Sequence, residues 1–216
     1  MSDRQVAAQR PPDPDRDYAG FPSYDVAPTT DWFRHHQERP GPDRGAWYFG
    51  SVPPGGGRFD LPAPHGTCYL ATSRAAAIRE LIGPEFLGLG WVPSDLLAGR
   101  IVSRLRVATS TRVANVSVAR AADYGVTSEL TSTPDYALTQ RWAQTFADAG
   151  FGGLRYGLRF TPGRARGLAL FGPAGPAAER EGDPLAQQAT DVVDRMGLQV
   201  VGPPHSRAVD LVSPPE

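Results

Sequence analysis

The sequence predicts an α+β protein built of mixed sheets with flanking helices. Strand-like and helix-like segments are intermixed along the chain, without the regular alternation that a parallel α/β sheet requires. No Gly-x-Gly-x-x-Gly run follows a strand-like segment, which argues against a Rossmann dinucleotide site. The length of 216 residues, with 40% hydrophobic and 21% charged side chains, fits one domain with tails.

The two ends of the chain are predicted to be tails. Residues 1–20 are polar and hold prolines at positions 11, 12 and 14, a composition typical of disorder. We therefore expect a disordered N-terminal tail over 1–20, a folded domain over 21–204 and a C-terminal tail over 205–216.

The first half of the domain is predicted to hold two strands and a helix after "TTDWFRHHQER", where structured sequence begins. "RFDL" (58–61) and "GTCYLAT" (66–72) are interpreted as short strands. In the second strand, Cys68 and Leu70 point to one face, whereas Thr67, Tyr69 and Ala71 point to the other. "TSRAAAIRELIG" (72–83) predicts a helix that Thr72 or Ser73 caps and that Gly83-Pro84 ends.

The second half is predicted to alternate strands and helices irregularly. In "DYALTQRWAQTFADAG" (135–150), Leu138, Trp142 and Phe146 recur every four residues, so this helix should bury Trp142 in a core. The expected strands are "GRIVSRLRVAT" (99–109), "FGGLRYGLRF" (151–160), its partner "RGLALFGP" (166–173), and "LQVVGPP" (198–204). A last helix is expected in "DPLAQQATDVVDRMG" (183–197).

The composition excludes several kinds of chemistry. All 22 basic side chains are Arg, so a Schiff-base lysine and a P-loop lysine are both absent. The net charge is −1 without a basic stripe, which argues against nucleic-acid binding. Cys68 is the only cysteine, so no intramolecular disulfide can form, and we expect no metal site. No apolar run approaches the ~20 residues needed to span a bilayer, so we expect no membrane association and a cytoplasmic protein.

Four residues form a candidate site: Arg34, Arg58, Tyr69 and Glu80. Arg58, Tyr69 and Glu80 are equally spaced along the predicted strand, turn, strand and helix, which would let them meet. Arginines suit a diphosphate, an aromatic ring suits a heterocycle, and a carboxylate can stabilise a cationic ribose. On the helix, Glu80 shares its side with small residues, which leaves room for a crevice. The pattern alone leaves open that Glu80 is a solvated glutamate beside Arg79.

The chain resembles the RES family, whose members are NAD-degrading toxins of toxin–antitoxin pairs. The matching stretches are "WFRHH", "GGGRFDLPAPHGTCYLATSRAAAIRE", "DYALTQRWAQTF", "GGLRYGLRF" and "GLALFGP", and they cover about residues 30–175. The resemblance implies an ADP-ribosyltransferase-like fold and a RES-like catalytic domain. It makes Arg34 and Arg58 the family arginines, Tyr69 the family tyrosine and Glu80 the family glutamate.

The resemblance also implies a substrate and partners. NAD would be the substrate, with no separate cofactor, and Arg34, His35, Arg58, Tyr69, Tyr156 and Leu158 would contact it. Phosphate and an antitoxin protein are further expected partners. The expected reaction is cleavage of the nicotinamide–ribose bond by hydrolysis or phosphorolysis. The alternatives are ADP-ribosyl transfer to an acceptor and a catalytically silent scaffold that binds NAD or a partner.

One position departs from the family pattern. Near "RYGLRF" the family has tyrosine, any residue, serine and arginine, so Leu158 stands at the serine position. A leucine offers none of the hydrogen bonds of a hydroxyl, and this substitution favours the silent scaffold or an altered activity.

Overall fold

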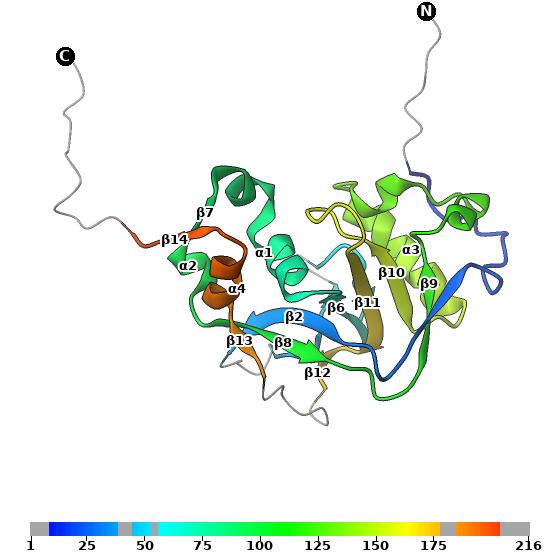
Figure 1. The fold of residues 1–216 in the computed structure, drawn as a ribbon. Coiled ribbons are helices and arrows are strands. Elements are labelled where there is room, and N and C mark those ends of the chain that lie inside the picture. The colour runs from blue at the N-terminus through cyan, green and yellow to red at the C-terminus, as the bar shows by residue number, and fades with distance from the viewer. Residues whose placement is uncertain (1–8, 39–44, 53–55, 178–184, 204–216) are drawn as a thin grey trace, which may run out of the picture.

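An eight-stranded mixed sheet runs through the computed structural model, which describes residues 9–38, 45–52, 56–177 and 185–203 (Figure 1). Its strands are β1 (Ser23–Val26), β2 (Trp32–Gln37), β6 (His65–Ala71), β8 (Arg100–Leu105), β9 (Thr111–Asn115), β10 (Gly153–Gly157), β11 (Arg166–Pro173) and β13 (Gln187–Gln188). The spatial order is β1-β9-β10-β11-β6-β2-β8-β13. β9 and β10 pair in parallel, whereas the other neighbours are antiparallel. The predicted α+β class is confirmed.

Three small strand pairs and six helical segments complete the described part of the chain. The pairs are β3 (Tyr48–Phe49) with β12 (Gly175–Pro176), β4 (Ser51–Val52) with β5 (Leu61–Pro62), and β7 (Trp91–Pro93) with β14 (Gln199–Val201). The helical segments are α1 (Arg74–Leu89), α2 (Ser94–Leu97), η1 (Ala119–Tyr124), η2 (Ser128–Thr131), α3 (Tyr136–Asp148) and α4 (Ala189–Arg195). α1, α2 and α4 group on one side of Figure 1, and α3 lies on the other, beside β10.

The residues of β6 show how the sheet separates two apolar layers. Cys68 and Leu70 belong to a cluster on one face, together with Trp32. Tyr69 packs against the cluster around α3, and Ala71 belongs to the cluster around α1 and α4. The predicted alternation of β6 is therefore confirmed, and the two groups of helices cover the same face of the sheet.

Helix α1 bends where the sequence predicts that it ends. Ser73 caps its N-terminus, as expected, and its Oγ accepts the N–H of Ala76 at 3.1 Å. Gly83 has φ 69° and ψ 178°, a non-helical conformation that favours glycine, and Pro84 then restarts the helix. The predicted stop at Gly83-Pro84 is thus a kink, and the helical turns continue to Leu89.

The predicted N-terminal tail is wrong for residues 9–20. Gln9 and Tyr18 are only 5% and 4% exposed, and the Tyr18 ring packs edge-on against Trp142 at 5.7 Å. Gln9 Nε2 donates to the carbonyl of Gly125 at 3.0 Å. These anchors fix a segment whose prolines and charges had indicated disorder. Residues 1–8 and the expected tail over 205–216 lie outside the described residues.

Several other elements differ from their predicted form. In "RFDL", only Leu61 pairs in a strand, because Arg58, Phe59 and Asp60 form a turn. The last helix is shorter than predicted, and Gln187–Gln188 forms β13 ahead of it. β1 and β9 were not predicted, and together they form one end of the sheet.

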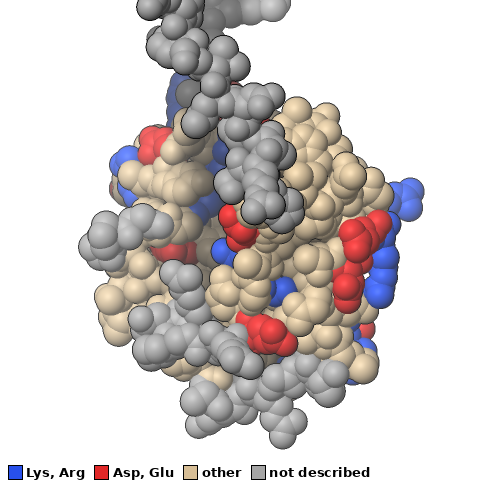
Figure 2. Space-filling view, turned by 90° about the vertical axis from the view of Figure 1, so that its left-hand side faces the viewer, with Lys and Arg blue, Asp and Glu red and all other residues tan. Residues whose placement is uncertain are grey.

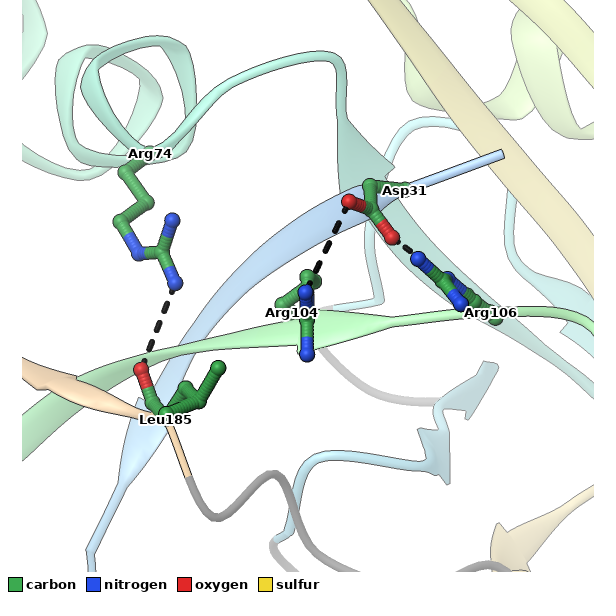
Figure 3. A network of polar contacts seen from close by, with 5 residues as sticks. All are labelled: Asp31, Arg74, Arg104, Arg106 and Leu185. Atoms are coloured by element: carbon green, nitrogen blue, oxygen red, sulfur yellow. Dashed lines mark hydrogen bonds and ion pairs between the residues drawn. The ribbon is translucent and has the colours of Figure 1, made fainter. Parts of the chain in front are cut away.

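Polar contacts at the start of β2 help to fix this strand against β8 (Figure 3). Asp31 Oδ1 accepts a hydrogen bond from Arg106 Nε at 2.6 Å, and Arg104 lies 3.9 Å from the same carboxylate. The bond from Arg106 lowers the pKa of Asp31. Arg74, at the start of α1, stacks on Phe33 and donates to the carbonyl of Leu185. The strand that carries Arg34 is thus tied to its neighbours at its first residues.

Figure 2 shows the side on which α2 and α4 lie, where acidic and basic side chains are interspersed. Among the described residues, no helix is long and apolar enough to cross a membrane. No group of three or more His, Cys, Asp or Glu within the same part of the chain could hold a metal ion.

Candidate active site

A cleft of about 420 Å³ lies between the two groups of helices, above β2, β6 and β10. This volume falls within the usual range of small-molecule sites, about 300–1,000 Å³. Its lining includes every residue that the sequence singled out for the site: Arg34, His35, Arg58, Tyr69, Glu80, Tyr156 and Leu158. The fold therefore brings the predicted residues to one place.

Glu80 enters the cleft from α1. Its Oε1 accepts the N–H of Phe160 at 2.9 Å and the hydroxyl of Thr161 at 3.4 Å, so the loop after β10 holds the carboxylate. Partial burial raises the pKa of Glu80, while these bonds and the charge of Arg58 oppose the rise. Ala77 lines the cleft beside it, as expected of a crevice with small residues. Glu80 is a half-buried cleft residue, not the solvated glutamate of the alternative interpretation.

Arg58 reaches the cleft from the turn before β5. Its Nη1 donates to the carbonyl of Thr133, and its guanidinium lies 5.0 Å from the centre of the Tyr136 ring. Burial lowers the pKa of Arg58, but an arginine stays cationic at neutral pH. The guanidinium is thus oriented by Thr133, just before α3, and by Tyr136, the first residue of α3.

Tyr69 presents its ring to the cleft and uses its hydroxyl elsewhere. The hydroxyl donates to Asp60 Oδ1 at 2.7 Å and accepts the N–H of Phe59 at 2.7 Å. Burial and the nearby Asp60 carboxylate raise the pKa of Tyr69, and burial also raises the pKa of Asp60. The hydroxyl therefore supports the turn that carries Arg58, and the ring is the part that can contact a ligand.

Tyr156 and Leu158 form the wall of the cleft on β10 and the loop that follows. The Tyr156 ring packs on Gly167, and its centre lies 5.0 Å from the centre of the Phe59 ring, edge to face. Burial, and then the negative charge of Glu80, raises the pKa of Tyr156, so its hydroxyl stays protonated at neutral pH. Leu158 is only 9% exposed and belongs to the same apolar cluster as Ile78. This wall is apolar where the family pattern has a hydroxyl.

Arg34 and His35 lie where β2 separates from β6. These strands pair only at Phe33 and Ala71. Beyond that point, Arg34 Nη1 donates to the carbonyl of Tyr48 at 2.7 Å and lies 2.8 Å from Cys68 Sγ. Arg34 therefore lines the cleft, but its guanidinium is bonded to groups on the other face of the sheet, whereas Arg58 is bonded at the rim of the cleft.

His35 is neutral in this position. Burial, with the charges of Arg100 and Arg34, lowers the pKa of His35 to about 3. Its Nδ1 is buried and has no hydrogen-bond partner among the described residues. His35 can therefore offer a neutral imidazole, but no positive charge, to a ligand.

Sequence reasoning missed several residues of the site. Asp60 belongs to the quoted "RFD" run, but its role depends on Tyr69 and was not visible in the spacing. Tyr136 and Phe160 also line the cleft. The strand predicted over 151–160 includes Arg159, but β10 ends at Gly157, and Arg159 lies exposed at the edge of the cleft.

The fold and the cleft together define an α+β protein with an aromatic, arginine-lined pocket around a held carboxylate. The model of the RES domain family matches residues 31–193, and the chain belongs to this family. Among solved structures, the chain is similar to the toxin in the "Crystal structure of the M.tuberculosis MbcT-MbcA toxin-antitoxin complex". The identity is 15% and the TM-score 0.55, over 82% of this chain and 92% of that one. No curated protein matches the sequence.

Proposed function

We propose that this protein cleaves the bond between nicotinamide and ribose in NAD, as the toxin of a toxin–antitoxin pair. The observation that carries the proposal is the Glu80 carboxylate, held by the loop after β10 inside a cleft with arginine and tyrosine side chains. Membership of the RES family and the likeness of the fold to MbcT support it.

Glu80 would stabilise the positive charge that develops on the ribose. When the C1′–N bond breaks, nicotinamide leaves as a neutral molecule with the bonding electron pair, and the ribose becomes cationic. A carboxylate fixed beside that carbon lowers the barrier, since its attraction is stronger in a partly desolvated site. Water or phosphate then forms the new bond to C1′ through oxygen, and water releases its proton to solvent.

Arg58 would bind the diphosphate, and the aromatic residues would contact the nucleoside. The planar guanidinium can donate to two phosphate oxygens at once. Arg34, whose guanidinium is bonded on the other face of the sheet, would add only its positive charge, and the neutral His35 would add hydrogen bonding. Tyr69 and Tyr156 offer ring surface to the nicotinamide or the ribose.

A second candidate is a scaffold that binds NAD without cleaving it. Leu158 favours this candidate, because an apolar wall cannot hold an attacking water by hydrogen bonds as a hydroxyl can. Transfer of ADP-ribose to another acceptor is a third outcome that the same assay separates.

The proposed partner is an antitoxin protein. The structural neighbour was crystallised as a toxin–antitoxin complex, and we propose a corresponding complex for this chain. Because NAD is a cytoplasmic metabolite, a cytoplasmic location is part of the proposal.

The test is an incubation of the purified protein with NAD, with and without phosphate, followed by separation of the products. Nicotinamide with ADP-ribose indicates hydrolysis, and nicotinamide with a phosphorylated ADP-ribose indicates phosphorolysis. Tight NAD binding without release of nicotinamide supports the scaffold. A protein that neither binds nor cleaves NAD would contradict both candidates.

A further inference from the structure

Five backbone polar groups of the turn that carries Arg58 are bonded by side chains, and four of these side chains come from outside the turn. Turns on a protein surface usually leave such groups to water. Here the bonds are Asp60 Oδ2 to the N–H of Gly57 (2.6 Å), Gln140 Nε2 to the carbonyl of Gly57 (3.1 Å), Thr139 Oγ1 to the carbonyl of Arg58, Tyr69 Oη to the N–H of Phe59 (2.7 Å), and Thr67 Oγ1 to the carbonyl of Phe59 (2.8 Å). We name these five side chains the turn clamp: Asp60, Thr67, Tyr69, Thr139 and Gln140.

Three members of the turn clamp are polar residues buried in the core. Asp60 is 4% exposed, Thr67 is 1% exposed and Thr139 is fully buried. Burying a polar group costs free energy unless it is hydrogen-bonded, so such groups stand where they fix a geometry. In this protein they converge on one turn of four residues.

The packing around the turn leaves it little freedom. A Cβ atom on Gly57 would lie 2.6 Å from the hydroxyl of Tyr69, so the backbone passes directly against that ring. Asp60 also accepts the Tyr69 hydroxyl, which joins the turn to β6. The backbone of Arg58 is thus held from the sheet on one side and from α3 on the other.

Helix α3 holds both ends of Arg58. Thr139 bonds its backbone carbonyl, and Tyr136, three residues earlier on the same helix, lies against its guanidinium. Positions three apart lie on one helix face. The direction of the Arg58 side chain is therefore set by α3 together with the carbonyl of Thr133 just before it.

We propose that the turn clamp positions Arg58 to bind a diphosphate, and that Thr139 is a positioning residue for the site. The inference rests on the proposed function, since the diphosphate is that of NAD. A side chain held in its binding geometry loses less freedom when the ligand arrives, so the clamp raises affinity. Thr139 itself does not touch the ligand.

The test compares Thr139→Val with Thr139→Ser. Valine keeps the shape and removes the hydroxyl, whereas serine keeps the hydroxyl. Calorimetry with ADP and with inorganic pyrophosphate gives the dissociation constants, and NAD turnover gives KM and kcat. We expect Thr139→Val to weaken binding and raise KM about threefold to tenfold with little change in kcat, as loss of one hydrogen bond implies. Thr139→Ser should stay within about twofold of the wild type.

A stability control separates positioning from general loosening. Val193→Ala opens the buried cluster at α4, away from the turn, and should lower the melting temperature while leaving both dissociation constants unchanged. Hydrogen exchange supplies a readout independent of NAD, because the Phe59 amide should exchange faster in Thr139→Val than in Val193→Ala.

The outcomes distinguish this inference from the proposed function. If the wild type binds pyrophosphate and ADP but does not cleave NAD, the proposed cleavage reaction is wrong. The dissociation constants of the Thr139 variants still test whether the turn clamp positions Arg58. Wild-type affinity in Thr139→Val, or an equal loss in Thr139→Ser, overturns the role of the hydroxyl. Failure of the wild type to bind any diphosphate overturns the clamp as a device for diphosphate binding.

Discussion

In the proposed function, Arg58 is the cationic residue on which binding of the diphosphate would depend most. A lysine in its place offers a point charge without the planar fork that can reach two oxygens. We expect Arg58→Lys to weaken ADP binding about tenfold or more, as for hydrogen bonds to charged groups. Calorimetry measures this, with Arg155→Lys as control, because Arg155 stacks on Tyr24 outside the cleft. An unchanged dissociation constant for Arg58→Lys would show that the diphosphate does not bind at Arg58.

In the proposed function, Leu158 stands where the resemblance places a serine, and its substitution tests whether that hydroxyl matters. Leu158→Ser restores a hydroxyl to the wall of the cleft, next to the loop that holds Glu80. We expect faster NAD cleavage together with a stability loss of roughly 2–5 kcal/mol, because a buried leucine is lost from its cluster. Nicotinamide release and chemical denaturation measure the two effects. A serine variant that is slower and equally stable would show that Leu158 is not part of the site.

At the scale of single elements, the kink in α1 depends on one glycine. Gly83 adopts φ 69° and ψ 178°, which a residue with a Cβ atom reaches only with strain. We expect Gly83→Ala to lower the free energy of unfolding by about 1–3 kcal/mol. Gly88 is a matched control, since it lies in the same helix with open space around it, and Gly88→Ala should be neutral or stabilising. Chemical denaturation measures the free energy of unfolding of both variants. Equal stability of the two would show that alanine causes no strain at position 83.

Elements with a regular pattern could be predicted from the sequence. The alternation of Cys68 and Leu70 against Tyr69 gave the faces of β6 correctly, and the four-residue spacing of Trp142 and Phe146 gave the buried face of α3. Glu80 was placed in the cleft by its small neighbours and by the family match. Local patterns of this kind report which side of an element is buried.

The turn at Arg58 shows why the rest could not be predicted. "RFDL" has the composition of a strand, but the carbonyl of Arg58 bonds to Thr139 and that of the preceding Gly57 bonds to Gln140, and both partners lie far along the chain. Such long-range hydrogen bonds leave no periodic trace in the sequence. For the same reason, Asp60 could not be assigned before its bond to Tyr69 was known.

At the scale of the whole molecule, the N-terminal segment is part of the core around α3 (Figure 1). Tyr18 packs against Trp142, and its hydroxyl accepts the N–H of Asp13 at 2.9 Å. We expect Tyr18→Ala to cost about 3–5 kcal/mol, the usual loss for a large buried aromatic side chain. Val201→Ala, at a position that is 41% exposed, should change stability by less than about 0.5 kcal/mol. Thermal or chemical denaturation measures this. If Tyr18→Ala is as stable as the wild type, the N-terminal segment does not contribute to the core.

The cleft forms because the two groups of helices lie apart on one face of the sheet. The cluster around α3 and the cluster around α1 and α4 lie on either side of it, and Tyr156 packs against both. Glu80 comes from one group and the contacts of Arg58 from the other. The proposed site therefore requires the whole fold, which explains why sequence spacing indicated its members but not its shape.

Release of nicotinamide from NAD by the wild type and by Glu80→Gln is the most direct test of the account. The amide keeps the size of the side chain and removes the charge that would stabilise a cationic ribose. We expect Glu80→Gln to fold and to bind NAD but to lose about 3–4 kcal/mol of transition-state stabilisation, a fall of roughly 10²–10³ in turnover. Near wild-type release by Glu80→Gln would contradict it.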